Sequence, residues 1–235
     1  MASHRNNQKV SFLALNAAGN VVLIVEVISV CVQTNFLFDI SENEDGLEAL
    51  QGLKYQPEFI DASEESTLLE HIRALPFREF EFHGYLGKRR IVSFGWRYEY
   101  TGRGELKKAE DIPDFLLGLR LRAASFAQIE AESLQQVLVT EYRSGAGIGW
   151  HRDKPVFDRV VGISLLEPCI LRFRRRLVRE VKDQKGRAVL QRVNLFAQRR
   201  SAYLLEGPVR TQWEHSILRV NGVRYSITFR SLRRS

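Results

Sequence analysis

The spacing of apolar side chains predicts two helices in the first half of the chain. The first, over residues 62–75, can be capped by Asp61 and Ser63 and ends before Pro76. The second opens at Asp111 and Pro113, because an acid followed by proline favours a helix start. Their apolar faces are formed by Leu68, Ile72 and Leu75 in the first helix and by Phe115, Leu116, Leu119 and Ala123 in the second.

From about residue 135 onward the pattern changes to short apolar runs separated by turn residues. Many short strands at this spacing favour a sandwich or barrel over alternating strand–helix units. The fold class expected from the whole pattern is therefore α+β and mainly β. The predicted strands cover residues 136–142, 160–166, 170–173, 189–196, 202–205, 215–220 and 224–229.

Residues 1–45 differ from the rest and are treated as an N-terminal extension, with the main domain spanning residues 46–235. The apolar run at 21–32 is short for a membrane helix, and Glu26 inside it would be costly in lipid. It also lacks the features of a signal peptide. We expect an extra strand or a poorly structured segment, and no membrane association.

The two cysteines, Cys31 and Cys169, match neither a disulfide framework nor zinc or redox spacing. A reduced intracellular protein, in the cytoplasm or in the nucleus or nucleoid, is the simplest expectation, and we expect a monomer. The net charge of +7 is concentrated in residues 172–235, which carry 17 Lys and Arg against 4 Asp and Glu. Such a basic region is typical of a nucleic-acid partner, although a solvated surface explains the charge equally well.

An aromatic, strand-like stretch at residues 78–101 is the first candidate for substrate contact. Phe94, Trp96, Tyr98 and Tyr100 alternate with period two, which places them on one face of a strand, and Arg90 lies nearby. Flat rings beside cations suit base stacking and phosphate binding. Trp96, Tyr98, Tyr100 and Arg90 are therefore candidate substrate-binding residues. The alternative is sheet core, which suits Phe94 and Trp96.

A possible metal site is the His151-x-Asp153 pair. On an extended strand, residues two apart point to the same face and can share one metal. His215, in another strand-like segment, would complete a set of two histidines and one carboxylate, the facial triad that holds non-haem Fe(II). The candidate catalytic and metal-binding residues are thus His151, Asp153 and His215. The alternative for His215 is a core histidine.

The last predicted strand carries an unusual polar face. Arg224, Ser226, Thr228 and Arg230 alternate with apolar residues and share one side. If this side is buried, the two guanidinium groups need an anion, and a dicarboxylate beside the metal would supply it. An edge strand with its polar face in water would show the same alternation.

Together, His151-x-Asp153, His215 and the Arg224/Arg230 pair resemble the AlkB family of Fe(II)/2-oxoglutarate dioxygenases. The resemblance covers roughly residues 46–230. It implies a double-stranded β-helix, or jelly roll, with N-terminal helices and a nucleotide-recognition lid. It also implies Fe(II), with 2-oxoglutarate and O2 as co-substrates. The residues implied for the 2-oxoglutarate pocket are Thr140, Tyr142, Arg224, Ser226 and Arg230.

Two positions depart from the family pattern. Thr140 stands where the family usually has asparagine, and Pro155 stands where repair members tend to have an acid that meets the damaged base. The function implied is oxidative demethylation of N-alkylated bases in DNA or RNA. The alternatives are the same chemistry on a protein side chain or small metabolite, or a non-catalytic nucleic-acid-binding module.

Overall fold

The computed structural model describes residues 11–15, 21–25, 44–82, 85–99, 105–177 and 189–233. The chain divides into two compact units, Met1–Ser41 and Glu42–Ser235. In the first unit, β1 (Ser11–Leu15) pairs antiparallel with β2 (Val21–Val25), so a strand occupies the start of the apolar run at 21–32. The rest of that run lies outside the described residues, and the boundary expected near residue 45 stays a prediction. No described helix is long and apolar enough to cross a membrane.

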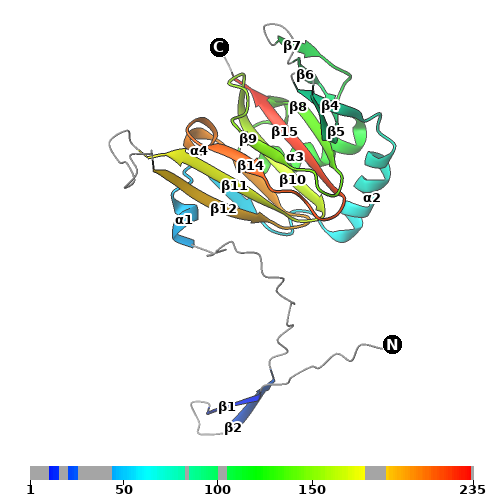
Figure 1. The fold of residues 1–235 in the computed structure, drawn as a ribbon. Coiled ribbons are helices and arrows are strands. Elements are labelled where there is room, and N and C mark those ends of the chain that lie inside the picture. The colour runs from blue at the N-terminus through cyan, green and yellow to red at the C-terminus, as the bar shows by residue number, and fades with distance from the viewer. Residues whose placement is uncertain are drawn as a thin grey trace, which may run out of the picture. The chain divides into compact units, whose positions relative to one another are not determined.

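Two antiparallel sheets form the body of the second unit (Figure 1). The major sheet has seven strands in the order β3-β13-β10-β15-β8-β5-β4, and the minor sheet has four in the order β12-β11-β14-β9. The major strands are β3 (Leu53–Gln56), β4 (Arg78–Phe82), β5 (Tyr85–Phe94), β8 (Leu134–Tyr142), β10 (Phe157–Leu166), β13 (Ala202–Leu205) and β15 (Arg224–Leu232). The minor strands are β9 (Ile148–His151), β11 (Cys169–Arg176), β12 (Leu190–Ala197) and β14 (Glu214–Ile217).

From β8 to β15 the chain passes repeatedly between the two sheets, which is the topology of the expected double-stranded β-helix. The seven strands predicted beyond residue 135 all exist, with ends shifted by a few residues. The sequence analysis did not predict β3 or β9, each four residues long. The chain also forms the short helices α1 (Glu44–Glu48), η1 (Asp114–Leu116), η2 (Ala131–Ser133) and α4 (Gly207–Thr211).

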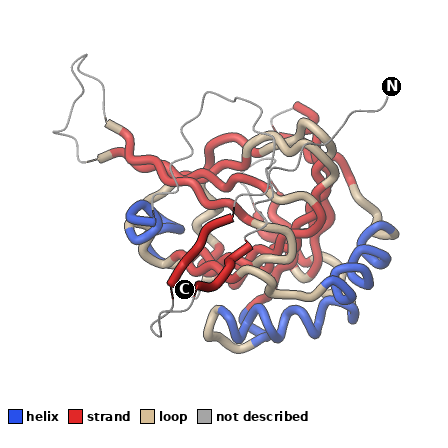
Figure 2. The backbone as a smooth tube through the Cα atoms, turned by 90° about the horizontal axis from the view of Figure 1, so that it is seen from below, coloured by secondary structure: helices blue, strands red, loops and turns tan. Residues whose placement is uncertain are grey.

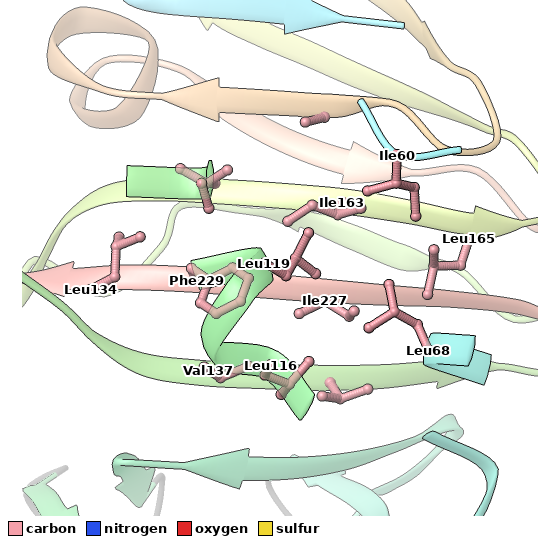
Figure 3. Close-up of a cluster of buried hydrophobic side chains, with 14 of the residues drawn as sticks. Ile60, Leu68, Leu116, Leu119, Leu134, Val137, Ile163, Leu165, Ile227 and Phe229 are labelled. Carbon is pink, nitrogen blue, oxygen red and sulfur yellow. The ribbon is translucent and has the colours of Figure 1, made fainter. Parts of the chain in front are cut away.

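Both predicted long helices form and pack on the outer face of the major sheet. They are α2 (Ala62–Arg73), capped by Asp61 and not by Ser63, and α3 (Leu117–Phe126). The start expected for the second helix at Asp111 and Pro113 is wrong, because the 3-10 turn η1 follows Pro113 and α3 begins only after it. Figure 2 shows the long helices lying together along one side of the strands. Leu68 from α2 and Leu119 from α3 meet Ile227 of β15 in a buried cluster, seen in Figure 3. Helix packing therefore covers the apolar face of β15 and leaves its polar face to the space between the sheets.

The aromatic stretch does not form one continuous strand, so the expectation that its four rings share one face is wrong. Gly95 separates β5 from β6 (Trp96–Glu99), which pairs instead with β7 (Glu105–Lys108). Gly95 has φ +72°, and a Cβ there would lie 2.1 Å from the Gln135 carbonyl oxygen, so only glycine fits this turn. Phe94 belongs to the helix-side core, as the alternative predicted.

Candidate metal centre and co-substrate pocket

The structure brings His151, Asp153 and His215 together. His151 ends β9 and lies directly opposite His215 on β14, and Asp153 follows two residues later. The two imidazole rings have centroids 4.2 Å apart, and Asp153 Oδ2 lies 3.8 Å from His215 Nε2. One possible ligand atom from each residue lies within 4.8 Å of the others. The backbone carbonyl of Gly149 is 2.9 Å from His151 Nδ1, which leaves Nε2 available for a metal.

The charge states of these groups suit metal binding. Burial on its own would raise the pKa of Asp153, but Arg230 and the two histidines bring it down to about 2. Burial lowers the pKa of His215 to about 4, against the attraction of Asp153. At neutral pH the cluster therefore presents a carboxylate and a neutral imidazole, which are the forms that ligate a metal.

Two arginines position the segment that carries Asp153. Arg230 Nη2 lies 3.5 Å from Asp153 Oδ1, while Arg230 Nη1 donates to Gln136 Oε1 at 3.1 Å. Arg210, buried on α4, donates to the backbone carbonyls of Asp153, Lys154 and Phe157. No local pattern in the sequence points to Arg210, because its role depends on α4 lying beside a loop more than 50 residues earlier.

Arg224 is fully buried at 0% exposure, yet none of its three guanidinium nitrogens meets a hydrogen-bond acceptor among the described residues. The guanidinium carbon lies 4.8 Å from the centre of the Tyr142 ring. Ser164 Oγ, a buried hydroxyl on the neighbouring strand, also has no partner in the described part of the chain. A buried cation without a counter-ion is costly. The site therefore fits an anion such as the distal carboxylate of a dicarboxylate.

Tyr203 is a site residue that the sequence did not predict. It lies on β13 directly opposite Gly162 of β10, and its hydroxyl lies 2.4 Å from where a Gly162 Cβ would be. Glycine is thus required at 162 to make room for the ring. Burial raises the pKa of the Tyr203 phenol, so the hydroxyl keeps its proton and can donate to a carboxylate. The sequence alone does not show that a glycine and a tyrosine on two different strands are neighbours, because this depends on the strand register.

A cavity of about 510 Å³ between the two sheets is lined by the metal cluster and by Tyr203. Of the predicted site residues, it is lined by Thr140, Tyr142, His151, Asp153, His215, Ser226 and Arg230. Thr140 lies opposite both Ser226 and Ile91 in the major sheet, so its hydroxyl faces the same side as the Ser226 hydroxyl. Arg224 is absent from the cavity wall and stands behind Tyr142.

The predicted substrate-binding residues do not all face the cavity. Arg90 is a correction: it donates two hydrogen bonds to Glu141, at 2.8 and 2.7 Å, on the sheet face opposite the cavity. Its neighbours Arg89 and Ile91 line the cavity, because alternate residues of β5 face opposite sides. The nearness of Arg90 to the aromatic stretch in the sequence could not show which face of the sheet its side chain lies on.

Tyr98 and Trp96 lie on β6. Lys154 Nζ lies 5.1 Å from the centre of the Tyr98 ring, and Lys154 lines the cavity. The Trp96 ring instead faces Lys108, whose Nζ is 5.9 Å from its centre. Tyr100 lies outside the described residues. Phe80 lines the cavity with the Arg89 guanidinium 3.9 Å from its ring centre, which adds an aromatic–cation pair that the sequence had not singled out.

The donor set fits the metal and the co-substrate that the motifs imply. Two imidazoles and one carboxylate, with open space beside them, match the facial triad that holds non-haem Fe(II). The buried guanidinium of Arg224, with Tyr142 and Tyr203 near it, matches one carboxylate of 2-oxoglutarate. The residues present are therefore those that Fe(II) and 2-oxoglutarate require.

Comparison with known proteins agrees with this geometry. A family model described as the 2OG-Fe(II) oxygenase superfamily matches residues 36–230. The "Alkylated DNA repair protein ALKBH8 homolog" of Arabidopsis thaliana is 29% identical over 201 residues, which cover 79% of this chain and 56% of that protein. The chain thus spans little more than half the length of this relative. The "Probable RNA/DNA demethylase ALKBH6" of Danio rerio is 27% identical over 175 residues, covering 72% and 70%.

Two solved structures share the fold. OsALKBH1 superposes with a TM-score of 0.54 at 16% identity, covering 77% of this chain and 96% of that one. A Pseudomonas putida prolyl-4-hydroxylase gives 0.50 at 17% identity, covering 81% and 97%. At these identities the likeness concerns the fold alone. With the metal triad, the unpaired arginine and the family match taken together, the chain belongs to the 2OG-Fe(II) oxygenase superfamily, as a member of the AlkB family of Fe(II)/2-oxoglutarate-dependent dioxygenases.

Proposed function

We propose that this protein oxidatively demethylates N-alkylated bases in nucleic acid, using Fe(II), 2-oxoglutarate and O2. The observation that carries the proposal is one cavity whose wall holds the His151–Asp153–His215 cluster together with aromatic rings and cations. The wall includes Phe80 with Arg89, and Lys154, whose Nζ lies 5.1 Å from the centre of the Tyr98 ring. A methylated base has a flat face for stacking and a phosphate on each side, so it matches both features.

The chain's own residues would bind and orient the reactants. His151, Asp153 and His215 would hold the metal, and Arg230 keeps the Asp153 carboxylate ionised and in place. Arg224 would pair with the distal carboxylate of 2-oxoglutarate, with Tyr142 beside it. Leu138, Leu171 and Leu205 form apolar wall around the centre and limit its access to water.

The chemistry that the metal and co-substrate supply when bound is hydroxylation of an N-methyl carbon, coupled to conversion of 2-oxoglutarate to succinate and CO2. The hydroxymethyl product then releases formaldehyde and leaves an unmethylated nitrogen. The target base has to leave its stack to bring the methyl group to the metal. Nucleic acid as substrate is consistent with the intracellular location that the cysteine usage suggests.

The test is turnover with methylated single- and double-stranded oligonucleotides, measuring succinate, formaldehyde and loss of the methyl group by mass spectrometry. We expect the three products in equal amounts, and none with His151→Ala. Persistence of the methyl group on every oligonucleotide, with succinate still formed, would remove nucleic acid as the substrate.

A second candidate is the same chemistry on a protein side chain or small metabolite. The observation in its favour is Pro155, which replaces the acid expected near the base and is exposed, outside the cavity wall. The charge of the cavity wall favours nucleic acid over this candidate, since Lys88, Arg89, Arg152 and Lys154 all line the cavity.

A further inference from the structure

The outer face of the minor sheet carries a row of arginines around a tryptophan. Alternate residues of β11 point inward and outward: Phe173 is buried toward His215, whereas Arg172 and Arg174 point outward. The Trp150 ring of β9 lies under both, with their guanidinium carbons 4.8 and 4.4 Å from its centre. The exposed residues Arg192, Asn194 and Phe196 of β12 pair with β11 residues of the same outer face. We call this set the arginine face.

The charges on the arginine face do not balance. Arg174 and Arg192 lie directly opposite each other on neighbouring strands, and like charges so placed destabilise a sheet. Burial and, after it, the proximity of Arg174 lower the pKa of Arg172, so these two arginines repel each other as well. Among the described residues of this face, Glu214 is the acid that compensates, through a 2.7 Å contact with Arg174. An external anion would relieve the excess.

The arginines are also held in a geometry that suits phosphate. Arg172 Nε donates to Ser216 Oγ and Arg174 Nε donates to Glu214 Oε2, so both are fixed through Nε. The Trp150 ring restricts the orientation of each planar guanidinium, and its terminal nitrogens can then meet phosphate oxygens as a fork. Phe196, 53% exposed at the other end of the face, offers a flat surface on which a base can stack.

The arginine face adjoins the cavity through Trp150. This residue lines the cavity, precedes the metal-cluster residue His151, and contacts the two arginines with its ring. Its strand, β9, is the edge strand of the minor sheet, so a chain leaving the cavity can cross this edge onto the outer face. Phe80 and Lys154 line the cavity from other parts of the chain.

We propose that the arginine face binds the phosphodiester backbone of a single-stranded nucleic acid, holding the part of the strand that flanks the base in the cavity. This inference rests on the proposed function and specifies where the rest of the substrate lies. It assigns Arg172, Arg174 and Arg192 to phosphate contact and Phe196 to base stacking. An acidic protein would satisfy the charges but would leave Phe196 without a matching partner.

The experiment measures binding of a fluorescently labelled single-stranded oligonucleotide, as DNA and as RNA, over a range of salt concentrations. Removing one cation that neutralises a phosphate should lower the slope of log affinity against log salt by roughly 0.7. We therefore expect a drop of roughly 0.7 for Arg192→Gln and roughly 1.4 for the double variant Arg172→Gln/Arg174→Gln. Phe196→Ala should weaken binding with the salt slope unchanged.

The matched control is Arg122→Gln, an exposed arginine on α3 that pairs with Glu64 on the helical side of the major sheet. It should leave affinity and slope as in the wild type. Arg192 is exposed and lies opposite Arg174, so Arg192→Gln should leave the unfolding temperature at or above the wild-type value, which separates lost binding from misfolding. This inference would be overturned, and the proposed function left standing, if the unmutated protein binds the oligonucleotide and both arginine variants show the same salt slope as the unmutated protein. A wild-type protein that binds no oligonucleotide would overturn both.

Discussion

Replacing Arg224 by methionine tests whether the structure has correctly identified an anion site. Arg224 is 0% exposed and its guanidinium nitrogens have no acceptor among the described residues. A buried unsatisfied polar group costs about 1–3 kcal/mol, and more when it is charged. Methionine fills a similar space without that cost. We therefore expect Arg224→Met to be more stable than the wild type in the absence of co-substrate, by at least about 1 kcal/mol.

The same substitution should abolish stabilisation by 2-oxoglutarate. Removing one partner of a buried ion pair costs about 3–5 kcal/mol, so the affinity for 2-oxoglutarate should fall by at least about 100-fold. The assay is thermal unfolding of wild type and variant, without and with saturating 2-oxoglutarate and Fe(II) under anaerobic conditions. A gain of about 1 kcal/mol corresponds to roughly 2–4 °C for a domain of this size.

Arg210→Met is the matched control, because Arg210 is also buried but donates to three backbone carbonyls. Its loss should destabilise the protein whether or not 2-oxoglutarate is present, since those carbonyls lose a charged donor. The reasoning about Arg224 is refuted if Arg224→Met is less stable than the wild type without co-substrate and still gains stability when 2-oxoglutarate is added.

Three further predictions concern the metal-cluster residue His215, the Tyr203 hydroxyl and the buried Glu65 of α2. His215→Ala should abolish the visible charge-transfer band that Fe(II) and 2-oxoglutarate give together under anaerobic conditions, and a wild-type band would refute the ligand assignment. Tyr203→Phe should weaken 2-oxoglutarate about 10-fold in calorimetry, the worth of one hydrogen bond, and unchanged affinity would place the hydroxyl outside the pocket. Glu65 is fully buried and accepts hydrogen bonds from the Leu166 amide at 2.8 Å and from Arg199 Nε at 2.6 Å. Glu65→Ala should therefore lower the free energy of unfolding by about 3 kcal/mol, and a loss below about 1 kcal/mol would contradict this.

Alternate residues of a strand face opposite sides of the sheet, and this explains why some site residues were predictable and others were not. His151 and Asp153 are two residues apart, and Arg224 to Arg230 alternate on one strand, so each pair is visible as a local pattern. Arg90 has no such pattern: nothing along the chain says whether it or Arg89 faces the cavity. Pairing with β8 decides the matter, since Arg90 lies opposite Glu141 and Arg89 lies opposite Tyr142.

The buried environment of the arginines was likewise beyond the sequence. The alternation in β15 fitted an edge strand in water as well as an interior one. In the structure, β15 lies between β10 and β8, and both of its faces are covered. That central position makes Ser226, Thr228 and Arg230 part of the cavity wall and leaves Arg224 buried without a hydrogen-bond acceptor among the described residues.

The sequence by itself determined the elements and the chemical set: the two helices, the strands beyond residue 135, and a histidine–aspartate pair with a distant histidine and two arginines. These follow from local periodicity and residue chemistry, which depend on neighbours within a few positions. Only the tertiary structure decided which residues meet. Tyr203 over Gly162, Arg210 on the loop after Asp153, and Arg172 and Arg174 on Trp150 join segments that are distant in sequence. Their contacts depend on strand register and sheet order, which long-range packing sets and no local pattern encodes.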